Sequence, residues 1–376
     1  LLILFCLPSC DELDEVPYST LAGSNVFVNE DGLKKATYGI YKNCAEVSQA
    51  PFHRFVLSEA GHLYCTMGIF GEALINPIYK FAQIPTNGYI SSVWNWHFRT
   101  ISRANSVISN ANKAVSDEAV ANIYIAEARF LRANAYYDLV RLFGGVPLID
   151  TEINSLTQSD LIYAPRASVE ETYNFIVEDM QFAETHLPYK WTGDDLGRVS
   201  AGTAKAILGK VYLTMAGKPL NNTEYYQKAV DKLKEVYGGS NEGKYGFGLE
   251  EKFDDIFSFS NERTQVLVLS FGYVRTTASP NANIFPFFLF PRGYRNGDEQ
   301  TFYGLTYDFY QLFETSDDRR DFIMVYRYEY AGESNHGAVP GDSIIYDLER
   351  KRYIIQRTGE TLGEGITTGG MEYTKM

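Results

Sequence analysis

The chain has 376 residues, enough for one large or two ordinary hydrophobic cores. It is 45% hydrophobic and 22% charged, which is typical of a folded globular protein and argues against a disordered chain. A formal net charge of −13 opposes binding to phosphate backbones, so we expect no nucleic-acid partner.

Aromatic residues are unusually frequent, at 15% of the chain, and 28 of them are Tyr. A buried Tyr hydroxyl group needs a hydrogen-bond partner, so this many Tyr residues are difficult to place in a dry core. The excess indicates a hydrated aromatic surface suited to recognising a ligand.

The N-terminus begins with an apolar run of seven residues, too short to span a bilayer. The run resembles the end of a secretory signal peptide, and Leu7-Pro8-Ser9-Cys10 resembles a bacterial lipobox. We expect residues 1–9 to be a residual lipoprotein signal and Cys10 to carry a lipid that is the only membrane attachment. Pro8 departs from the usual small residue, and a buried N-terminal strand is the alternative interpretation.

Two other cysteines, Cys44 and Cys65, would remain in the mature chain. An exported location permits a disulfide between them. Two separate buried thiols are at least as consistent with the sequence.

Helical periodicity organises the first two thirds of the chain. Asn29 can cap a first helix, which ends near residue 44. Residues 45–90 contain many Gly and Pro residues and predict an irregular segment. Further helices are predicted over residues 91–115, 121–145, 168–187, 200–216 and 223–237.

The segment 121–145 has the strongest helical pattern. Two stripes predict that this helix is buried on two sides, one through Ala126, Phe130, Ala133, Tyr137 and Val140, the other through Leu131, Leu139 and Leu142. Ser168 and Glu171 have the spacing of a capping box at the start of the next helix. The last helix is expected to bury Tyr226, Val230, Leu233 and Tyr237.

Short connections between the later helices suggest tetratricopeptide-like helical hairpins, although the strict repeat consensus is absent. Beyond about residue 250 the pattern changes to short strand-like runs, aromatic loops and Gly-rich turns. The predicted fold is mainly α, with a helical-hairpin scaffold over about residues 25–250. A loop-rich part with minor β-structure follows over about residues 251–376.

The order of these motifs resembles the SusD/RagB family of outer-membrane nutrient-binding lipoproteins of the Bacteroidetes. The sequences AEARFLR at 126–132 and YYDLVRLFGGVPL at 136–148 are similar to the signature helix of that family. Trp94 through Asn105, Arg166 with the capping box, and Gly197-Arg198 extend the similarity.

The resemblance implies a tetratricopeptide-like scaffold that caps a SusC-like TonB-dependent transporter and delivers a glycan to it. The lipid anchor would then hold the protein on the outer membrane, facing the cell exterior. The resemblance also implies one nutrient-binding domain over residues 10–376. This domain would be incomplete at its C-terminus, since the family normally continues through a further helical pair.

Familiar catalytic and metal-binding patterns are missing from the sequence. There is no HExxH, G-x-S-x-G or Walker motif, and the five His residues lack metal-ligand spacing. We therefore expect a binding protein without enzymatic activity, cofactor or metal ion.

A glycan site needs flat rings for the C–H faces of sugars and polar side chains for their hydroxyl groups. Two segments satisfy this, residues 60–97 and 281–303. The ligand-binding candidates are Tyr64, Tyr79, Tyr89 and Trp96 in the first segment and Arg292, Tyr294 and Asp298 in the second. For Trp96, binding and plain packing are both open, whereas Trp94 lies on the predicted inward stripe. Trp191 either is exposed or covers a helix end.

Capture of a glycan and its delivery to a transporter is the favoured function. A helical-repeat scaffold for protein interactions, a binder of a non-sugar nutrient such as a peptide, and an all-helical glycosidase are the alternatives. The sequence does not specify which glycan is bound.

Overall fold

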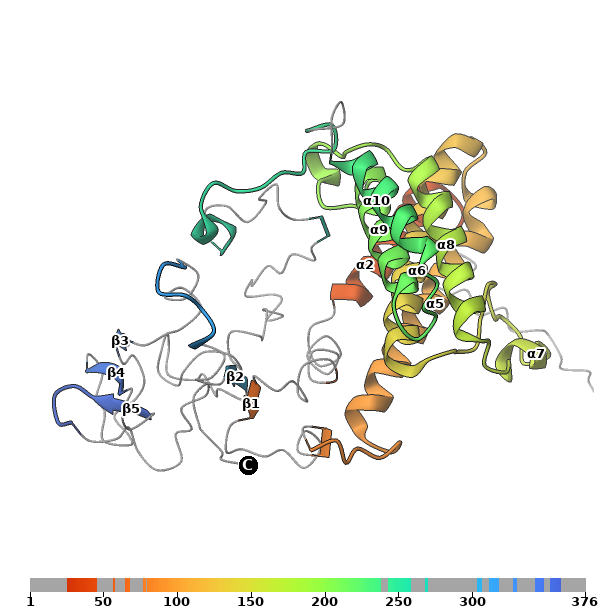
Figure 1. Cartoon of the computed structure of the whole chain (residues 1–376). Helices are drawn as coiled ribbons and strands as arrows, with labels where there is room; N and C mark the ends of the chain where they lie inside the picture. The colour runs from red at the N-terminus through yellow and green to blue at the C-terminus, as the bar shows by residue number, and fades with distance from the viewer. Residues whose placement is uncertain are drawn as a thin grey trace, which may run out of the picture.

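The computed structural model describes residues 26–45, 57, 65–67, 77–78, 80–237, 243–257, 268–269, 303–305, 311–317, 327–329, 342–347 and 352–359. Figure 1 shows the long helices gathered on one side and the short strands on the other. The predicted mainly α class is confirmed. None of the helices in the described ranges is both long and apolar enough to cross a bilayer.

The first two long helices begin at Asn caps. Helix α2 (Glu30–Ala45) starts as predicted, with Asn29 Oδ1 accepting a hydrogen bond from the Gly32 N–H at 3.0 Å. Helix α5 (Gly88–Ala114) starts earlier than the predicted Ser91, because Asn87 Oδ1 accepts from the Tyr89 N–H at 2.9 Å. The cap places Gly88 in the helix rather than in the preceding loop.

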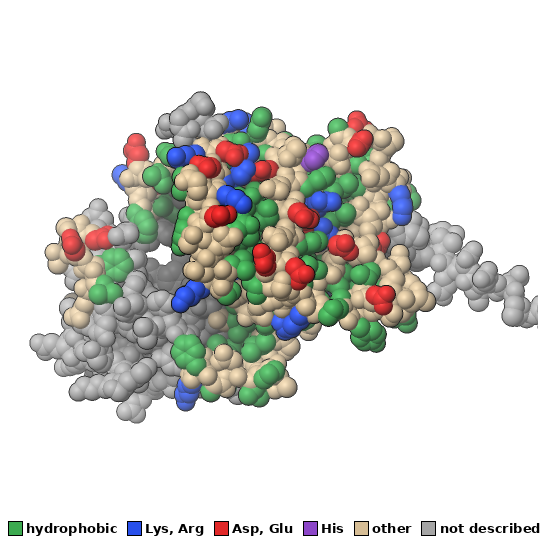
Figure 2. All heavy atoms as spheres, turned by 45° about the vertical axis from the view of Figure 1, so that its right-hand side comes forward, with side chains coloured by type: hydrophobic (Ala, Val, Ile, Leu, Met, Phe, Trp, Pro, Cys, Tyr) green, Lys and Arg blue, Asp and Glu red, His purple; other side chains and the backbone are tan. Residues whose placement is uncertain are grey.

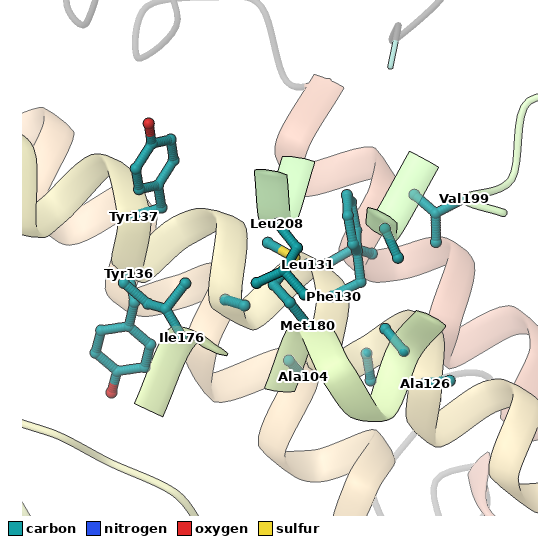
Figure 3. Close-up of a cluster of buried hydrophobic side chains, with 14 of the residues drawn as sticks. Ala104, Ala126, Phe130, Leu131, Tyr136, Tyr137, Ile176, Met180, Val199 and Leu208 are labelled. Carbon is teal, nitrogen blue, oxygen red and sulfur yellow. The ribbon is translucent and has the colours of Figure 1, made fainter. Parts of the chain in front are cut away.

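Helix α6 (Glu118–Phe143) is the centre of the bundle. Asp117 caps its start, and Gly144, with a φ of 72°, ends it in a conformation that favours glycine. Both predicted stripes are buried, apart from the half-buried Leu142. In Figure 3, Tyr136 and Tyr137 point to different sides of the helix, as two-sided burial requires. The prediction for this helix is therefore confirmed.

Three charged side chains on α6 are buried as well, and each reaches a different neighbour. Glu127 pairs with Arg198, in the segment before α9. Arg132 contacts Asp179 of α8 at 2.8 Å, and Asp138 lies 3.4 Å from His97 of α5. Glu127 and Arg132 are each compensated by an opposite charge on another element, whereas the cationic partner of Asp138 is Arg141 of α6 itself, at 3.4 Å.

The next elements are a short helix α7 (Ser159–Ile162) and helix α8 (Val169–His186). The predicted capping box is present: the Glu171 N–H donates to Ser168 Oγ at 3.1 Å, and the Ser168 N–H donates to Glu171 Oε2 at 2.8 Å. The predicted inward residues Tyr173, Ile176, Met180, Ala183 and Leu187 are all buried.

A 3-10 turn η1 (Gly193–Asp195) precedes helices α9 (Ala201–Ala216) and α10 (Glu224–Val236). These two helices pack together, as predicted. Gly209 allows the close approach, because a Cβ atom there would lie 2.7 Å from the Leu233 side chain.

The predicted inward face of α10 is wrong. Tyr226, Val230, Leu233 and Tyr237 remain 49%, 44%, 41% and 51% exposed, whereas Ala229 and Val236 are buried. Lys232 explains the rotation of the helix, because its ammonium group pairs with Glu184 of α8 at 2.9 Å and its side chain is only 14% exposed. This ion pair turns a charged side of α10 toward the bundle and leaves the apolar stripe at the flank.

The strands form two small antiparallel sheets. Strand β1 (Cys65–Met67) pairs with β2 (Tyr303–Leu305), and β3 (Arg327–Glu329), β4 (Ser343–Asp347) and β5 (Arg352–Ile355) form the second sheet in that order. A 3-10 turn η3 (Phe253–Phe257) lies between the helices and the strands. The predicted minor β-structure of the later part is thus confirmed.

The core lies where α6 meets α5 and α8, with α9 against α8 and α2 against α5 and α6. Figure 3 shows Phe130, Leu131, Met180 and Leu208 gathered between the helices, and each is at most 1% exposed. Burial of each such side chain contributes about 1.5–3 kcal/mol, so these contacts hold the helices in place.

Candidate ligand-binding site

Two of the predicted ligand-binding residues lie in the described part of the chain, and both are on α5. Tyr89 is 6% exposed, so its ring belongs to the core more than to the surface. Trp96 is half-buried. The remaining candidates and the predicted lipidation residue lie outside the described residues and stay predictions: Tyr64, Tyr79, Arg292, Tyr294, Asp298 and Cys10.

The Trp96 ring is fixed against the C-terminal end of α2. Its indole N–H donates to the Asn43 carbonyl at 2.7 Å, and the Asn43 side chain donates to Thr100 Oγ1 at 2.6 Å and to the Trp96 carbonyl at 3.3 Å. The Asn43 carbonyl belongs to the last turn of a helix and otherwise lacks an intrahelical donor. Trp96 therefore has a set orientation before any ligand arrives, which reduces the entropy lost on binding.

Near Trp96 lie a buried imidazole, that of His97, and a half-buried thiol, that of Cys44. His97 is 1% exposed, and its Nδ1 lies 2.7 Å from the Val93 carbonyl. Cys44 is a free thiol, and burial raises its pKa to about 12, with the Thr100 hydroxyl group opposing the rise. The side chain of Cys65 lies outside what the structure describes, so the choice between a disulfide and two separate thiols stays a prediction.

The β1–β2 pairing joins the two segments that the sequence singled out. Its register places Cys65 opposite Leu305, Thr66 opposite Gly304 and Met67 opposite Tyr303. Strand β1 lies within the segment 60–97, and β2 begins at the last residue of the segment 281–303. Two aromatic segments that are far apart in the sequence are thereby tied together through their backbones.

A second aromatic centre lies at Trp191, in the loop between α8 and α9. The indole N–H donates to the Val199 carbonyl at 2.8 Å, and the Arg198 guanidinium carbon lies 3.8 Å from the ring centroid. An open pocket of about 370 Å³ lies beside the ring. The pocket is lined from α2, α6 and this loop, so three separate parts of the chain build it.

An ionic network holds this pocket in shape. Arg198 donates to Glu127 Oε2 at 3.1 Å and to Asp195 Oδ1 at 3.0 Å, and Tyr41 donates to Glu127 Oε2 at 2.6 Å. Burial raises the pKa of Glu127, while the Arg198 and Tyr41 hydrogen bonds oppose that rise. The hydrogen bond from Lys34 is the largest cause that lowers the pKa of Asp195 to about 2.

A larger cavity of about 510 Å³ lies beside the C-terminal end of α8 and the neighbouring helices α9 and α10. Its lining includes the exposed Tyr189 and a compensated set of charges, because Lys205 pairs with Glu235 and lies 3.6 Å from Glu184. Figure 2 shows the same mixture of charges on the surface of the helical part, where acidic and basic side chains lie next to each other with hydrophobic side chains between them.

Among the residues of the smaller pocket, the sequence singled out Trp191 and Arg198, neither of them as a ligand-binding candidate. Lys34, Tyr124 and Asp195 were missed as members because they belong to three segments that carry no common pattern. One signal in the sequence could have brought Arg198 to this place. Glu127 of the AEARFLR motif lies in a helix that is predicted to be buried on two sides and therefore requires a cationic partner, which Arg198 of the Gly197-Arg198 motif supplies.

Comparison with known proteins gives a consistent result. A SusD-like family profile, described as starch-binding associating with outer membrane, matches residues 13–213. SusD-like protein P2 of Formosa agariphila is 31% identical over 261 residues, covering 68% of this chain and 48% of the relative. The chain spans about half the length of the curated relatives it matches.

Solved structures share the fold. A SusD superfamily protein from Parabacteroides distasonis superposes with a TM-score of 0.69 at 23% identity, covering 86% of this chain and 68% of that one. A laminarin-binding SusD-like protein superposes with a TM-score of 0.68 at 24% identity, covering 91% and 75%. At these identities the likeness supports the helical architecture.

Proposed function

Since this chain belongs to the SusD-like family, described as starch-binding associating with outer membrane, we propose that it captures a glycan at the bacterial surface. The observation that carries the proposal is the β1–β2 pairing, which joins two segments rich in aromatic and polar residues. Trp96 adds a half-buried ring whose orientation is already fixed. Such rings stack on the C–H faces of sugars, while surrounding polar groups bond the hydroxyl groups.

The finer parts of the proposal follow from the family and the N-terminal sequence. Residues 10–376 act as one binding domain, anchored through a lipid on Cys10 and facing the cell exterior. The domain passes its glycan to a SusC-like TonB-dependent transporter and does not cleave it. The laminarin-binding relative supports a glycan over a peptide as the ligand.

Isothermal titration calorimetry with laminarin and starch oligosaccharides tests capture directly. The wild type should bind at least one of them saturably, and chromatography of the mixture should show no new sugar product. Trp96→Ala should weaken binding at least tenfold, and Trp96→Phe less, because a ring remains. Tyr163→Ala is the control, since this ring is 82% exposed on a different part of the surface. Helicity measured by circular dichroism should be unchanged in all three.

Either sugar cleavage or the absence of binding to every glycan would contradict the proposal. Affinity for laminarin that is equal in Trp96→Ala and the wild type would place the site elsewhere.

Anchoring and partnership need their own experiment. The chain is expressed in its host with its native leader, as wild type and as Cys10→Ser. The wild type should incorporate a radiolabelled fatty acid and co-purify with a large outer-membrane β-barrel, whereas Cys10→Ser should be unlabelled and leave the membrane fraction. Labelling of Cys10→Ser would refute the assignment of the anchor.

A further inference from the structure

We propose that the pocket beside Trp191 is a second saccharide subsite, selective for uncharged sugar residues. This inference rests on the proposed glycan capture and adds a position and a ligand class to it.

Packing in the core does not account for Trp191. Trp94 packs against Phe98 and Phe143, with ring centroids 4.8 and 5.2 Å away. Trp191 is half-buried in a loop, and the ring contact that the described residues give it is the Arg198 guanidinium group. Its N–H is satisfied by Val199, so the ring is held in place without being enclosed by the bundle.

The pocket beside Trp191 is lined by both apolar and polar side chains. Val120 and Ile123 of α6 line the pocket next to Trp191, and Glu30, Asp31 and Lys34 line it from the start of α2. A volume of about 370 Å³ lies in the range of small-molecule sites, which is about 300–1,000 Å³. A sugar ring presents the matching surfaces, an apolar C–H face and a polar edge.

The charged side chains that line the pocket favour an uncharged ligand. The pocket is lined by three carboxylates, Glu30, Asp31 and Asp195, and by two cations, Lys34 and Arg198. Both cations contact Asp195, at 3.1 Å from Lys34 and 3.0 Å from Arg198, and Arg198 also pairs with Glu127, so two carboxylates compensate the two cations. A carboxylated or sulfated sugar would meet unfavourable electrostatics, whereas hydroxyl groups find acceptors.

The polar side chains of the pocket are held in place by hydrogen bonds before any ligand binds. The Tyr124 hydroxyl donates to Glu30 at 3.0 Å, and the Tyr38 hydroxyl donates to Asp195 at 2.9 Å. The polar side chains of the rim therefore have defined positions before binding, and little rotamer entropy remains to be lost.

The subsite is separate from the one at Trp96, although both touch α2. Lys34 is in the second turn of α2, whereas the Trp96 partner Asn43 is in the last turn. Nine residues of helix rise about 14 Å, so one sugar ring cannot contact both positions.

Fluorine NMR on protein labelled with 5-fluorotryptophan tests the inference. Trp96→Phe and Trp191→Phe assign two of the three resonances, and both variants keep an aromatic ring. Titration with a neutral laminarin oligosaccharide should shift the Trp191 resonance saturably. An oligogalacturonate at the same concentration should shift it at least tenfold less.

Binding measurements complete the design. Trp191→Ala should lower the affinity or the stoichiometry for the laminarin oligosaccharide at least fivefold, Trp191→Phe should restore most of it, and Tyr163→Ala should match the wild type. If Trp191→Ala does not fold, the labelled wild type still decides the question.

Three outcomes separate this inference from the proposed function. A shift at Trp96 without one at Trp191 would overturn the second subsite and leave glycan capture standing. An equal shift with the uronate would overturn the selectivity. The absence of any shift and of any heat of binding would overturn both proposals.

Discussion

Glu127 and Arg198 are 71 residues apart in the chain, and they form a buried ion pair that ties α6 to the segment before α9. The Glu127 side chain is 0% exposed and the Arg198 side chain 8%. The pair connects two motifs that are separate in the sequence, AEARFLR at 126–132 and Gly197-Arg198. Arg198 also lines the Trp191 pocket, so the stability of the bundle and the shape of that pocket both depend on the position of this side chain.

Arg198→Met should lower the free energy of unfolding by about 3–5 kcal/mol, because Glu127 would stay buried as an uncompensated carboxylate. Urea denaturation followed by circular dichroism measures the change. Lys35→Met is the control: it breaks an exposed pair with Asp31 and should cost at most about 1 kcal/mol. The double variant Glu127→Leu/Arg198→Met should recover part of the loss, since no unpaired charge would then lie between the two positions. A loss below about 1 kcal/mol in Arg198→Met would contradict this account.

The contribution of Asp195 should depend on pH. The pKa of Asp195 is lowered to about 2, and the hydrogen bond from Lys34 is the largest cause. The carboxylate therefore stabilises the fold fully above the pKa of the unfolded chain, near 3.8, and this contribution is lost as the pH falls toward 2. Asp195→Asn should therefore destabilise the protein by about 1 kcal/mol at pH 6, after allowance for solvent screening, and by less at pH 3. Asp194→Asn, at the exposed neighbouring position, should change stability by less than about 0.5 kcal/mol. An effect of Asp195→Asn that grows toward pH 3 would have the wrong sign.

Two glycines should respond in opposite directions to alanine. A Cβ atom at Gly145 would lie 1.9 Å from the Ala167 carbonyl oxygen. The Ala167 backbone is held in place by the hydrogen bond from its N–H to the Val146 carbonyl. Gly145→Ala should therefore lower the free energy of unfolding by about 1–3 kcal/mol. Gly39, inside α2, has nothing within 4 Å of that position, so Gly39→Ala should stabilise by about 0.5–1 kcal/mol. Thermal unfolding midpoints suffice to compare them. Equal shifts of the two midpoints would mean that the close approach at Gly145 is absent in solution.

Cys44 should resist alkylation in the native protein. Burial raises its pKa to about 12, so the reactive thiolate is scarce at neutral pH. Iodoacetamide labelling at pH 7.5, read by peptide mass spectrometry, should modify Cys44 slowly until denaturant is added. A cross-linked peptide joining Cys44 to Cys65 would show instead that the two thiols pair.

Much of the scaffold could be predicted because its signals are local. Asn29 and the Ser168–Glu171 capping box mark helix starts within a few residues, and the two stripes of α6 follow from the helical period alone. These features need no knowledge of the partner helix. The starts of α2 and α8 and the two-sided burial of α6 were therefore accessible from the sequence, whereas α5 and α6 each start three residues before the predicted position.

The missed features depend on contacts between distant segments. Hydrophobic periodicity predicted a buried stripe on α10 that stays largely exposed, whereas Lys232 of the same helix pairs with Glu184 of α8 and is mostly buried. The three-residue strands β1 and β2 are too short to carry a period of two, so their pairing left no trace in the sequence. The Trp191 pocket was inaccessible for the same reason, since its members meet only after α2, α6 and the following loop have packed.

The three buried charges of α6 also fix the alignment of the bundle along its axis. An apolar helix face rich in Ala and Leu tolerates a slide of one turn, about 5.4 Å, because one small or branched side chain replaces another. Glu127 and Arg132 form ion pairs with Arg198 and with Asp179 of α8, and Asp138 lies 3.4 Å from His97 of α5. A slide would separate these three side chains from their partners on the neighbouring elements at once. The described helices therefore have a single register along the bundle axis, and the loop between α8 and α9, which carries Trp191, is held at a fixed position along that axis.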